Sequence, residues 1–285
     1  MHGEGLGFDP PNLHLLSTTL AALESVFGNP TAVRRGLRDG HVRRIPPAMA
    51  KAHTTWKVLP HGPFEKLSER LWRVEGNLEG IDMKRVMTIA RRADESLVIH
   101  NAIALDDAAM AELDAWGKVG VIVVPNGFHR LDARVFHERY PEARVVCPAG
   151  ARSKVEQVVP VSGSYEDVPS DGAVELVTLD GTKQREGVMI VRAKDGTSLV
   201  INDAVFNMPH VAGFTGFMLR RITGSTGGPR VSRLIRWLVI ADKPAFRAHL
   251  ERLAALPELR RIIVSHHLTV DRDPSAALRE VAGRL

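Results

Sequence analysis

Histidine, aspartate and asparagine side chains follow four of the buried strands that the sequence predicts, at the point where each strand ends. This placement matters because ligands in α/β folds collect where strands end and loops begin. Histidine nitrogens and aspartate oxygens are also ligand types that zinc, iron and manganese take in proteins. The residues are, in chain order, His100 and Asn101, Asn126 and His129, Asn202 and Asp203, and Ser265, His266 and His267.

The strands that deliver these residues belong to a mixed pattern of strands and helices. A hairpin over 85–103 leads the first half, in which further strands alternate with helices. The second half has strands over 174–179, 188–193, 198–205 and 261–264, and helices over 243–253 and from 274 onward. Because strand pairs lead each half and no set of nucleotide-binding glycines is present, the pattern predicts an α/β fold with two sheets between helices.

The N-terminal segment differs from the rest of the chain. Residues 17–27 have helical spacing, and the basic stretch that follows contains Pro46 and Pro47. A short helix of this kind is marginal when it stands alone. We therefore predict a helical and basic extension over 1–57 and a single main domain over 58–285.

Composition excludes several classes of protein and of site. The 285 residues are 44% hydrophobic and 25% charged, which is ordinary for a globular protein. The single cysteine, Cys147, excludes an intramolecular disulfide and a thiolate zinc cluster, so a metal would need histidine and carboxylate ligands. The chain has no run of about 18 apolar residues and no basic, apolar leader at its start, so we expect a cytoplasmic protein without a membrane span.

Basic residues are concentrated in two segments. Residues 31–57 contain seven Lys or Arg against one acid, Asp39. Residues 204–241 contain no acid and five arginines, namely Arg220, Arg221, Arg230, Arg233 and Arg236. Such clusters attract phosphate, nucleic acid or an anionic substrate. Because no interleaved aromatics or nucleic-acid module accompany them, we expect a solvated surface or one that pairs subunits of a homo-oligomer, and no nucleic-acid partner.

Four segments resemble parts of one known superfamily. The strand LVINDAVFN (199–207) ends in an aspartate and IIVSHH (262–267) ends in histidine, as do corresponding strands of the metallo-β-lactamase superfamily. LVIHNAIAL (97–105) and VVPNGFHRL (123–131), with Glu186 before a late hairpin, resemble an uncharacterised branch of that fold, a domain-of-unknown-function family. The resemblance covers roughly residues 58–270 and implies a four-layer αββα sandwich.

The chain departs from the metal signature of this superfamily, HxHxDH after a buried strand. The corresponding residues here are Val124, Pro125, Asn126, Gly127, Phe128 and His129. Only the last histidine of the signature is present, and the segment between 179 and 186 lacks the further histidine that the superfamily normally supplies. The resemblance therefore implies that the usual two-metal site cannot be built.

The residues that remain suffice for one metal ion. The resemblance assigns them as follows: His129, Asp203 and His266 as ligands of one zinc, iron or manganese ion, and His100, Asn126 and His267 as lining of the pocket. A catalytic zinc commonly has three protein ligands and one open position, where it lowers the pKa of bound water. Asp203 or Glu186 could then accept the proton from that water. This interpretation predicts a hydrolase of a small ester or anionic substrate.

A metal-free alternative fits the same residues. His129 could cap the helix that begins near Leu131, and Asp203 could hold a loop by accepting backbone N–H bonds. The scaffold would then serve as a non-catalytic binding or assembly protein for an unknown small-molecule ligand. The sequence leaves both possibilities open, so whether the protein is an enzyme depends on whether the three side chains meet at one place.

Overall fold

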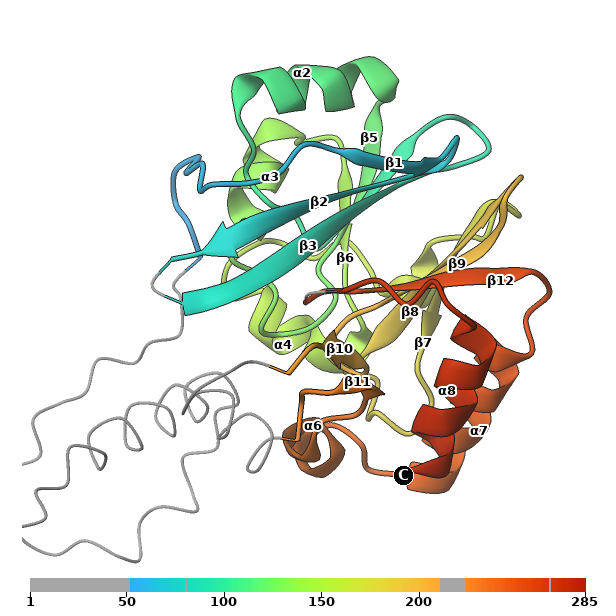
Figure 1. Ribbon diagram of the computed structural model, residues 1–285. Coiled ribbons are helices and arrows are strands. Elements are labelled where there is room, and N and C mark those ends of the chain that lie inside the picture. The colour runs from blue at the N-terminus through green and yellow to red at the C-terminus, as the bar shows by residue number, and fades with distance from the viewer. Residues whose placement is uncertain (1–51, 80, 211–223, 267) are drawn as a thin grey trace, which may run out of the picture. The chain divides into compact units, whose positions relative to one another are not determined.

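The computed structural model describes residues 52–79, 81–210, 224–266 and 268–285 (Figure 1). The predicted helix over 17–27 and the pocket residue His267 lie outside these ranges. Residues 52–57 pack on the main body, where Trp56 stacks on Phe136 with ring centroids 5.1 Å apart. The domain boundary between 57 and 58 stays a prediction.

The first sheet has six strands in the order β1-β2-β3-β4-β5-β6. The first four pair antiparallel, and β5 and β6 continue the sheet in parallel. Their bounds are β1 (Glu65–Ser68), β2 (Leu71–Leu78), β3 (Ile81–Arg91), β4 (Leu97–His100), β5 (Val119–Val123) and β6 (Arg144–Val146). The hairpin of β3 and β4 confirms the predicted one. β1 and β2 lie outside the elements predicted above, because charged residues and Gly76 interrupt the apolar alternation of their sequences.

The second sheet has four strands in the order β12-β9-β8-β7. Here β12 runs parallel to β9, and the other neighbours pair antiparallel. The bounds are β7 (Val174–Thr178), β8 (Gly187–Ala193), β9 (Gly196–Ile201) and β12 (Leu259–Val264). A separate antiparallel ribbon joins β10 (Phe206–Met208) to β11 (Gly228–Arg230).

Helices lie outside both sheets (Figure 1). Their bounds are α2 (Asp107–Trp116), α3 (Ala133–Arg139), α4 (Arg152–Val155), α6 (Arg233–Leu238), α7 (Lys243–Ala254) and α8 (Pro274–Gly283), with short 3-10 turns at Ala149–Ala151 and Tyr165–Asp167. Aspartate side chains cap the first turns of two helices: Asp106 accepts the N–H of Ala109 at α2, and Asp242 accepts that of Ala245 at α7, which begins where the sequence predicts. Among the described residues, no helix is long and apolar enough to cross a membrane.

Hydrophobic cores lie between the layers of the described residues, and two of these cores involve the first sheet. Between the sheets, strand residues such as Val98 and Val123 of the first sheet pack with Met189 and Val200 of the second. On the other face of the first sheet, Ile99 and its neighbours pack with α2, α3 and α4. The helices α7 and α8 pack on each other and α8 contacts β12 of the second sheet.

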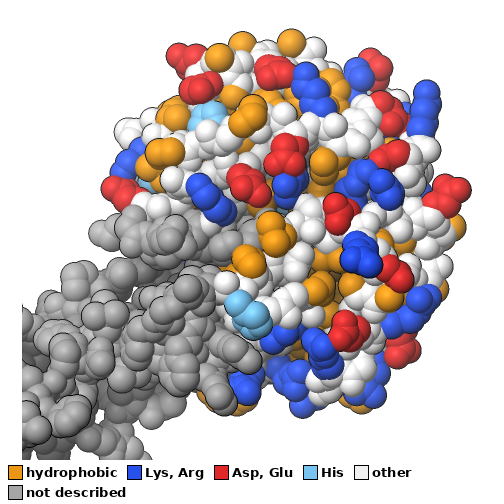
Figure 2. Space-filling model, viewed as in Figure 1, with side chains coloured by type: hydrophobic (Ala, Val, Ile, Leu, Met, Phe, Trp, Pro, Cys, Tyr) orange, Lys and Arg blue, Asp and Glu red, His pale blue; other side chains and the backbone are white. Residues whose placement is uncertain are grey.

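This arrangement is an αββα sandwich, as predicted. Alternate residues of each strand point to opposite faces, so an uninterrupted apolar strand such as β5 supplies both cores at once. The surface is of mixed charge, and Figure 2 shows acidic and basic side chains interspersed over one face of the described residues. The polar residues of interest lie where the apolar strands end.

Candidate metal centre

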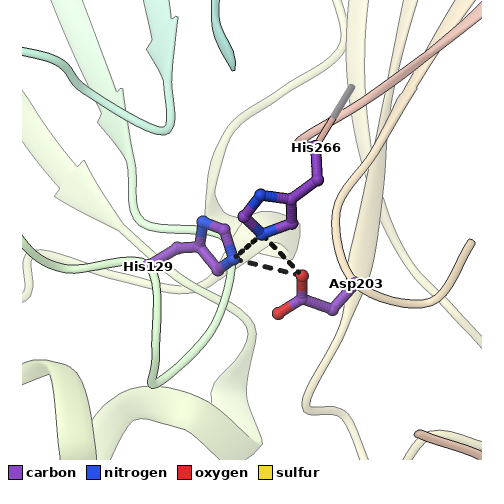
Figure 3. Close-up of side chains that lie close together, drawn as sticks. All are labelled: His129, Asp203 and His266. Carbon is purple, nitrogen blue, oxygen red and sulfur yellow. Dashed lines mark hydrogen bonds and ion pairs between the residues drawn. The ribbon is translucent and has the colours of Figure 1, made fainter. Parts of the chain in front are cut away.

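Three loops that follow strands bring His129, Asp203 and His266 together (Figure 3). His129 follows β5 in the first sheet, and Asp203 and His266 follow the parallel neighbours β9 and β12 in the second. Parallel strands end at the same edge of a sheet, which places the last two side chains next to each other. The two sheets are tied at this edge, because the N–H of Val86 on β3 donates to the carbonyl of Ser265 at 2.9 Å.

The three side chains turn one atom each toward a common point. His129 Nε2 lies 3.1 Å from Asp203 Oδ1, His266 Nε2 lies 3.5 Å from the same oxygen, and the two Nε2 atoms are 3.3 Å apart. The three ligand atoms all lie within 4.8 Å of one another. Side chains of His129 and His266 are each 11% exposed and that of Asp203 is 7% exposed, so the group is sheltered but reachable. We call these three residues, which are candidate metal ligands, the ligand group.

Hydrogen bonds fix which nitrogen of each histidine carries the proton. His266 Nδ1 lies 2.9 Å from the carbonyl oxygen of Lys84, which only accepts, so Nδ1 is the protonated nitrogen. His129 Nδ1 lies 3.1 Å from Asn101 Oδ1. The amide nitrogen of Asn101 donates to the carbonyl of Val86 at 2.8 Å, so its oxygen is the atom that faces His129 and accepts from Nδ1. In their neutral form, both rings would therefore direct an Nε2 lone pair into the ligand group, the arrangement that metal-bound histidines show.

Two lone pairs at 3.3 Å repel each other unless a cation or a proton lies between or beside them. Burial by itself raises the pKa of Asp203, but the charges and hydrogen bonds of His129 and His266 outweigh burial and hold that pKa well below its usual range. Burial lowers the pKa of His266, and its bond to Asp203 reverses this and raises it. The group is thus an anionic carboxylate that requires positive charge next to it.

The other oxygen of Asp203 faces an amide. Asn126 Nδ2 donates to Asp203 Oδ2 at 2.8 Å and to Glu186 Oε1 at 2.7 Å, all three side chains being buried. The oxygen of the same amide accepts the N–H groups of Phe128 and His129 at 2.8 and 3.0 Å. This turn, which asparagine side chains favour, shapes the loop that presents His129. Asn126 therefore positions His129 and joins two carboxylates.

Glu186 is the most deeply buried acid of the site. Burial and the neighbouring charge of Asp203 raise its pKa well above the usual range, and the amide groups around it only partly oppose this. Its second oxygen, Oε2, has no hydrogen bond of ordinary geometry. Glu186 therefore tends to hold a proton, and its connection to the ligand group runs through the Asn126 amide.

His100 lies at the end of β4, inside the protein. It is fully buried, and neither of its ring nitrogens has a hydrogen-bond partner among the described residues. Burial and the neighbouring His129 lower its pKa to about 3, so the ring is neutral. His100 is therefore close to the ligand group without belonging to it. The opposite residue on β3, Thr88, also has a buried hydroxyl without a partner.

A buried ion pair between Arg85 and Asp132 lies next to the site and holds one of its loops. Neither residue is among the candidates predicted from the sequence. Arg85 Nη2 donates to Asp132 Oδ2 at 2.5 Å, and their side chains are 4% and 0% exposed. Asp132 also lies 2.6 Å from His53 Nδ1 and accepts the N–H of Ala104 at 3.2 Å. Asp132 follows His129 by three residues, so this pair anchors the loop that carries His129 to β3. The sequence did contain a signal for this ion pair, because an arginine inside an apolar strand needs a buried counterion.

Comparison with known proteins identifies the architecture. No family model and no curated protein matches the sequence. A metallo-β-lactamase from Erythrobacter litoralis, solved with β-mercaptoethanol in its active site, is similar in structure, with a TM-score of 0.53 and 14% identity over 78% of this chain and 96% of that chain. The metallo-β-lactamase FIM-1 from Pseudomonas aeruginosa in its mono-zinc form has a TM-score of 0.52 and 12% identity over 80% and 97%.

At such identities the likeness concerns the course of the backbone, and it agrees with the four layers described above. The more specific resemblance to an uncharacterised branch has no matching family model and stays a prediction. On the evidence of its layers, strand order and structural neighbours, the chain has the fold of the metallo-β-lactamase superfamily.

Proposed function

We propose that the protein binds one metal ion, which is zinc, iron or manganese, through His129, Asp203 and His266, and hydrolyses a small ester or anionic substrate there. The observation that carries this proposal is the convergence of three ligand atoms within 4.8 Å. Two histidines and one carboxylate are a ligand set that catalytic zinc and non-haem iron both accept. The similar lactamase FIM-1 is described in a mono-zinc form, which supports a single metal on this fold.

The residues fit a cation on chemical grounds. Each histidine is held by a hydrogen bond on Nδ1, so in the neutral ring Nε2 carries the lone pair that can bind a metal. The carboxylate of Asp203 is ionised and sheltered, and the two Nε2 atoms are closer than neutral rings tolerate without positive charge. A proton on His266 is the alternative source of that charge, and it competes with the metal for the same nitrogen.

The residues of the chain have separate roles in this proposal. A metal held by the ligand group would act as a Lewis acid toward a carbonyl or phosphoryl oxygen. Asp203 provides the negative charge and keeps both histidines aligned, and Asn126 fixes Asp203 through Oδ2. Glu186, with its raised pKa, is the group that holds or accepts a proton behind Asn126.

A single metal follows from what lies on the other side of Asp203. There the Asn126 amide donates to both carboxylates at 2.7 and 2.8 Å, so an uncharged donor contacts the two oxygens that a shared second ion would need. Val124, at the place of a superfamily histidine, is buried in the core beneath the helices. The side chains present therefore support one metal and oppose a second.

Metal analysis of the purified full-length chain tests the proposal. The chain is stripped with a chelator and dialysed against zinc, iron(II) or manganese(II), and the metal is counted by elemental mass spectrometry. We expect about one ion per chain, with loss in His129→Ala and Asp203→Ala. His137→Ala is the matched control, because His137 lies on the following helix α3, outside the ligand group.

Activity is measured on the same preparations with p-nitrophenyl acetate and bis-p-nitrophenyl phosphate as probes. Hydrolysis that appears on adding metal, and that disappears in both ligand variants but not in His137→Ala, supports the hydrolase. A chain that binds no metal and whose melting temperature no metal raises overturns the proposal. That result would favour the metal-free binding or assembly protein on the same scaffold.

A further inference from the structure

A second polar site lies away from the ligand group, at a cavity of about 200 Å³. Three parts of the chain contribute to it: the segment around β11, the helix α6 and the C-terminal end of α8. The residues that line it are Gly224, Arg230, Val231, Arg233, Arg236, Val281 and Arg284. Four of these seven residues are arginines and none is acidic. We call it the arginine cavity.

The structure extends the basic cluster seen in the sequence. Arg230, Arg233 and Arg236 come from the acid-free segment 204–241, and Arg284 joins them from the other end of the domain. Figure 2 shows Lys and Arg side chains along the lower part of the face, where Figure 1 places α6 and the end of α8. The fold thus brings basic residues from distant parts of the sequence to one cavity. The basic residues of a single segment could not form this lining by themselves.

Arg236 is held in place but not neutralised. Its Nη2 donates to the carbonyl of Arg284 at 2.6 Å, and its Nε is buried without a hydrogen-bond partner among the described residues. A carbonyl satisfies one N–H of a guanidinium but carries no negative charge. A buried guanidinium donor without a partner is costly, and an anion is the partner that removes this cost.

Arg284 and Arg236 differ in how their charge is offset. Glu280 pairs with Arg284 at the exposed end of α8, where both side chains are about half exposed. Arg236 forms no ion pair with an acid among the described residues. Of these two guanidinium groups, that of Arg236 therefore has the greater need of an anion, and the anion would lie in the cavity that both residues line.

Backbone turns bring the segment around β11 close to the arginines. Gly224 and Gly227 adopt positive φ of 61° and 97°, which glycine adopts without strain. A Cβ at Gly227 would lie 3.0 Å from Arg230 Nη2, and this guanidinium donates to the Gly227 carbonyl. The loop therefore fixes Arg230 at the edge of the cavity before any ligand arrives, which lowers the entropic cost of binding.

We propose that the arginine cavity binds the diphosphate part of a small molecule. Guanidinium forks match phosphate oxygens in pairs, and several arginines suit a group with more than one negative charge. The volume of about 200 Å³ equals that of roughly seven waters at about 30 Å³ each, which is room for two phosphoryl groups. The site contains none of the metal-ligand candidates, so this proposal goes beyond the hydrolase and does not depend on it.

Calorimetric titration of the full-length chain with inorganic pyrophosphate tests the inference. We expect saturable binding at one site per chain, weakened by added salt because it is electrostatic. Arg233→Ala and Arg284→Ala should each weaken binding at least about tenfold, since a charge-assisted hydrogen bond of this kind contributes on that order. Both arginines are exposed, and an unchanged circular dichroism spectrum would show that the variants fold.

Matched controls separate this site from general electrostatics and from the metal centre. Arg260→Ala removes an exposed arginine on β12 and should leave binding unchanged, as should His129→Ala in the ligand group. ADP in place of pyrophosphate distinguishes a nucleotide from a free diphosphate, and tighter binding of either one supports the site and identifies its source. The inference is overturned if pyrophosphate does not saturate, if Arg233→Ala and Arg284→Ala bind like wild type, or if His129→Ala abolishes binding.

Discussion

Asp203 presents its two oxygens to two sides of one polar site, and these sides are built for different partners. On the histidine side, Oδ1 meets the Nε2 atoms of His129 and His266. On the amide side, Oδ2 meets the Nδ2 group of Asn126, which also bonds Glu186. One carboxylate thus faces a place suited to a cation and a place already filled by an uncharged donor.

The difference shows how one carboxylate can offer a cation site on one side while an uncharged donor occupies its other side. An amide supplies two N–H donors but no charge, so it does not offset the repulsion between two buried carboxylates that are both ionised. Burial and the charge of Asp203 raise the pKa of Glu186, which provides that neutrality. On the amide side, a proton on Glu186 and the Asn126 amide together reduce the repulsion between the two carboxylates. On the histidine side, positive charge stabilises Asp203 instead.

Asp132→Asn should disturb both the histidine side and the amide side of Asp203, because Asp132 anchors the loop that carries His129 and Asn126. It has the largest expected effect on stability. The change leaves Arg85, which is 4% exposed, without its counterion, and costs about 3 to 5 kcal/mol in free energy of unfolding. Urea denaturation followed by circular dichroism measures it. The control is Asp114→Asn, whose partner Arg139 is partly exposed and whose loss should cost under about 1 kcal/mol. Equal costs for both variants would contradict the anchoring role of Asp132.

Asp203→Asn should break the histidine side and spare the amide side. The new amide oxygen can still accept from Asn126, but the anionic ligand is lost. Because even residues that only support a ligand contribute 10- to 100-fold to metal affinity, we expect affinity for zinc to fall at least about 100-fold. Competition with a fluorescent chelator measures the change. Retention of wild-type affinity would show that Asp203 is not a ligand.

Asn126→Ala should break the amide side. Two buried carboxylates lose their shared donor, and we expect a loss of about 1 to 3 kcal/mol in free energy of unfolding. The loss should be smaller in a Glu186→Gln background, because glutamine brings its own N–H donor and no charge. A double-mutant cycle by urea denaturation measures this coupling, and strict additivity of the two changes would contradict it.

Glu186→Gln should have the smallest effect, and one that depends on pH. In the metal-free protein the raised pKa means that the folded chain keeps a proton that the unfolded chain releases above about pH 4.5. The free energy of unfolding of wild type should therefore fall, relative to the variant, as pH rises from 4.5 toward the raised pKa. Melting temperatures of both proteins between pH 4 and 8 test this. A constant offset over that range would contradict a neutral Glu186.

Most of the fold could be predicted from the chain alone. The apolar runs of β5, β9 and β12 and the hairpin of β3 and β4 follow from local periodicity, which tertiary contacts do not reverse. β1 and β2 could not, because their stability comes from pairing across the edge of the sheet and their own residues alternate poorly. Their charged residues include Glu65 and Arg73, which bond each other across the two strands at 2.9 Å.

The residue types of the candidate site could be predicted from the sequence, but the hydrogen bonds that connect them could not. Because His129, Asp203 and His266 each follow a buried strand, the sequence indicated that they could meet. Local patterns carry no information on which nitrogen of a ring is free, and this depended on Asn101 and the carbonyl of Lys84. His267 lies outside the described residues, so its role as pocket lining stays a prediction.

The sequence by itself determined that polar side chains stand at strand ends in an α/β fold and that basic residues gather in one acid-free segment, because both are properties of neighbouring residues. Only the tertiary structure decided that Asn126 connects Glu186 to Asp203, that Arg85 finds Asp132, and that Arg284 completes the arginine cavity. The physical reason is that hydrogen bonds and ion pairs act over a few ångströms of space, whereas these partners are far apart along the chain.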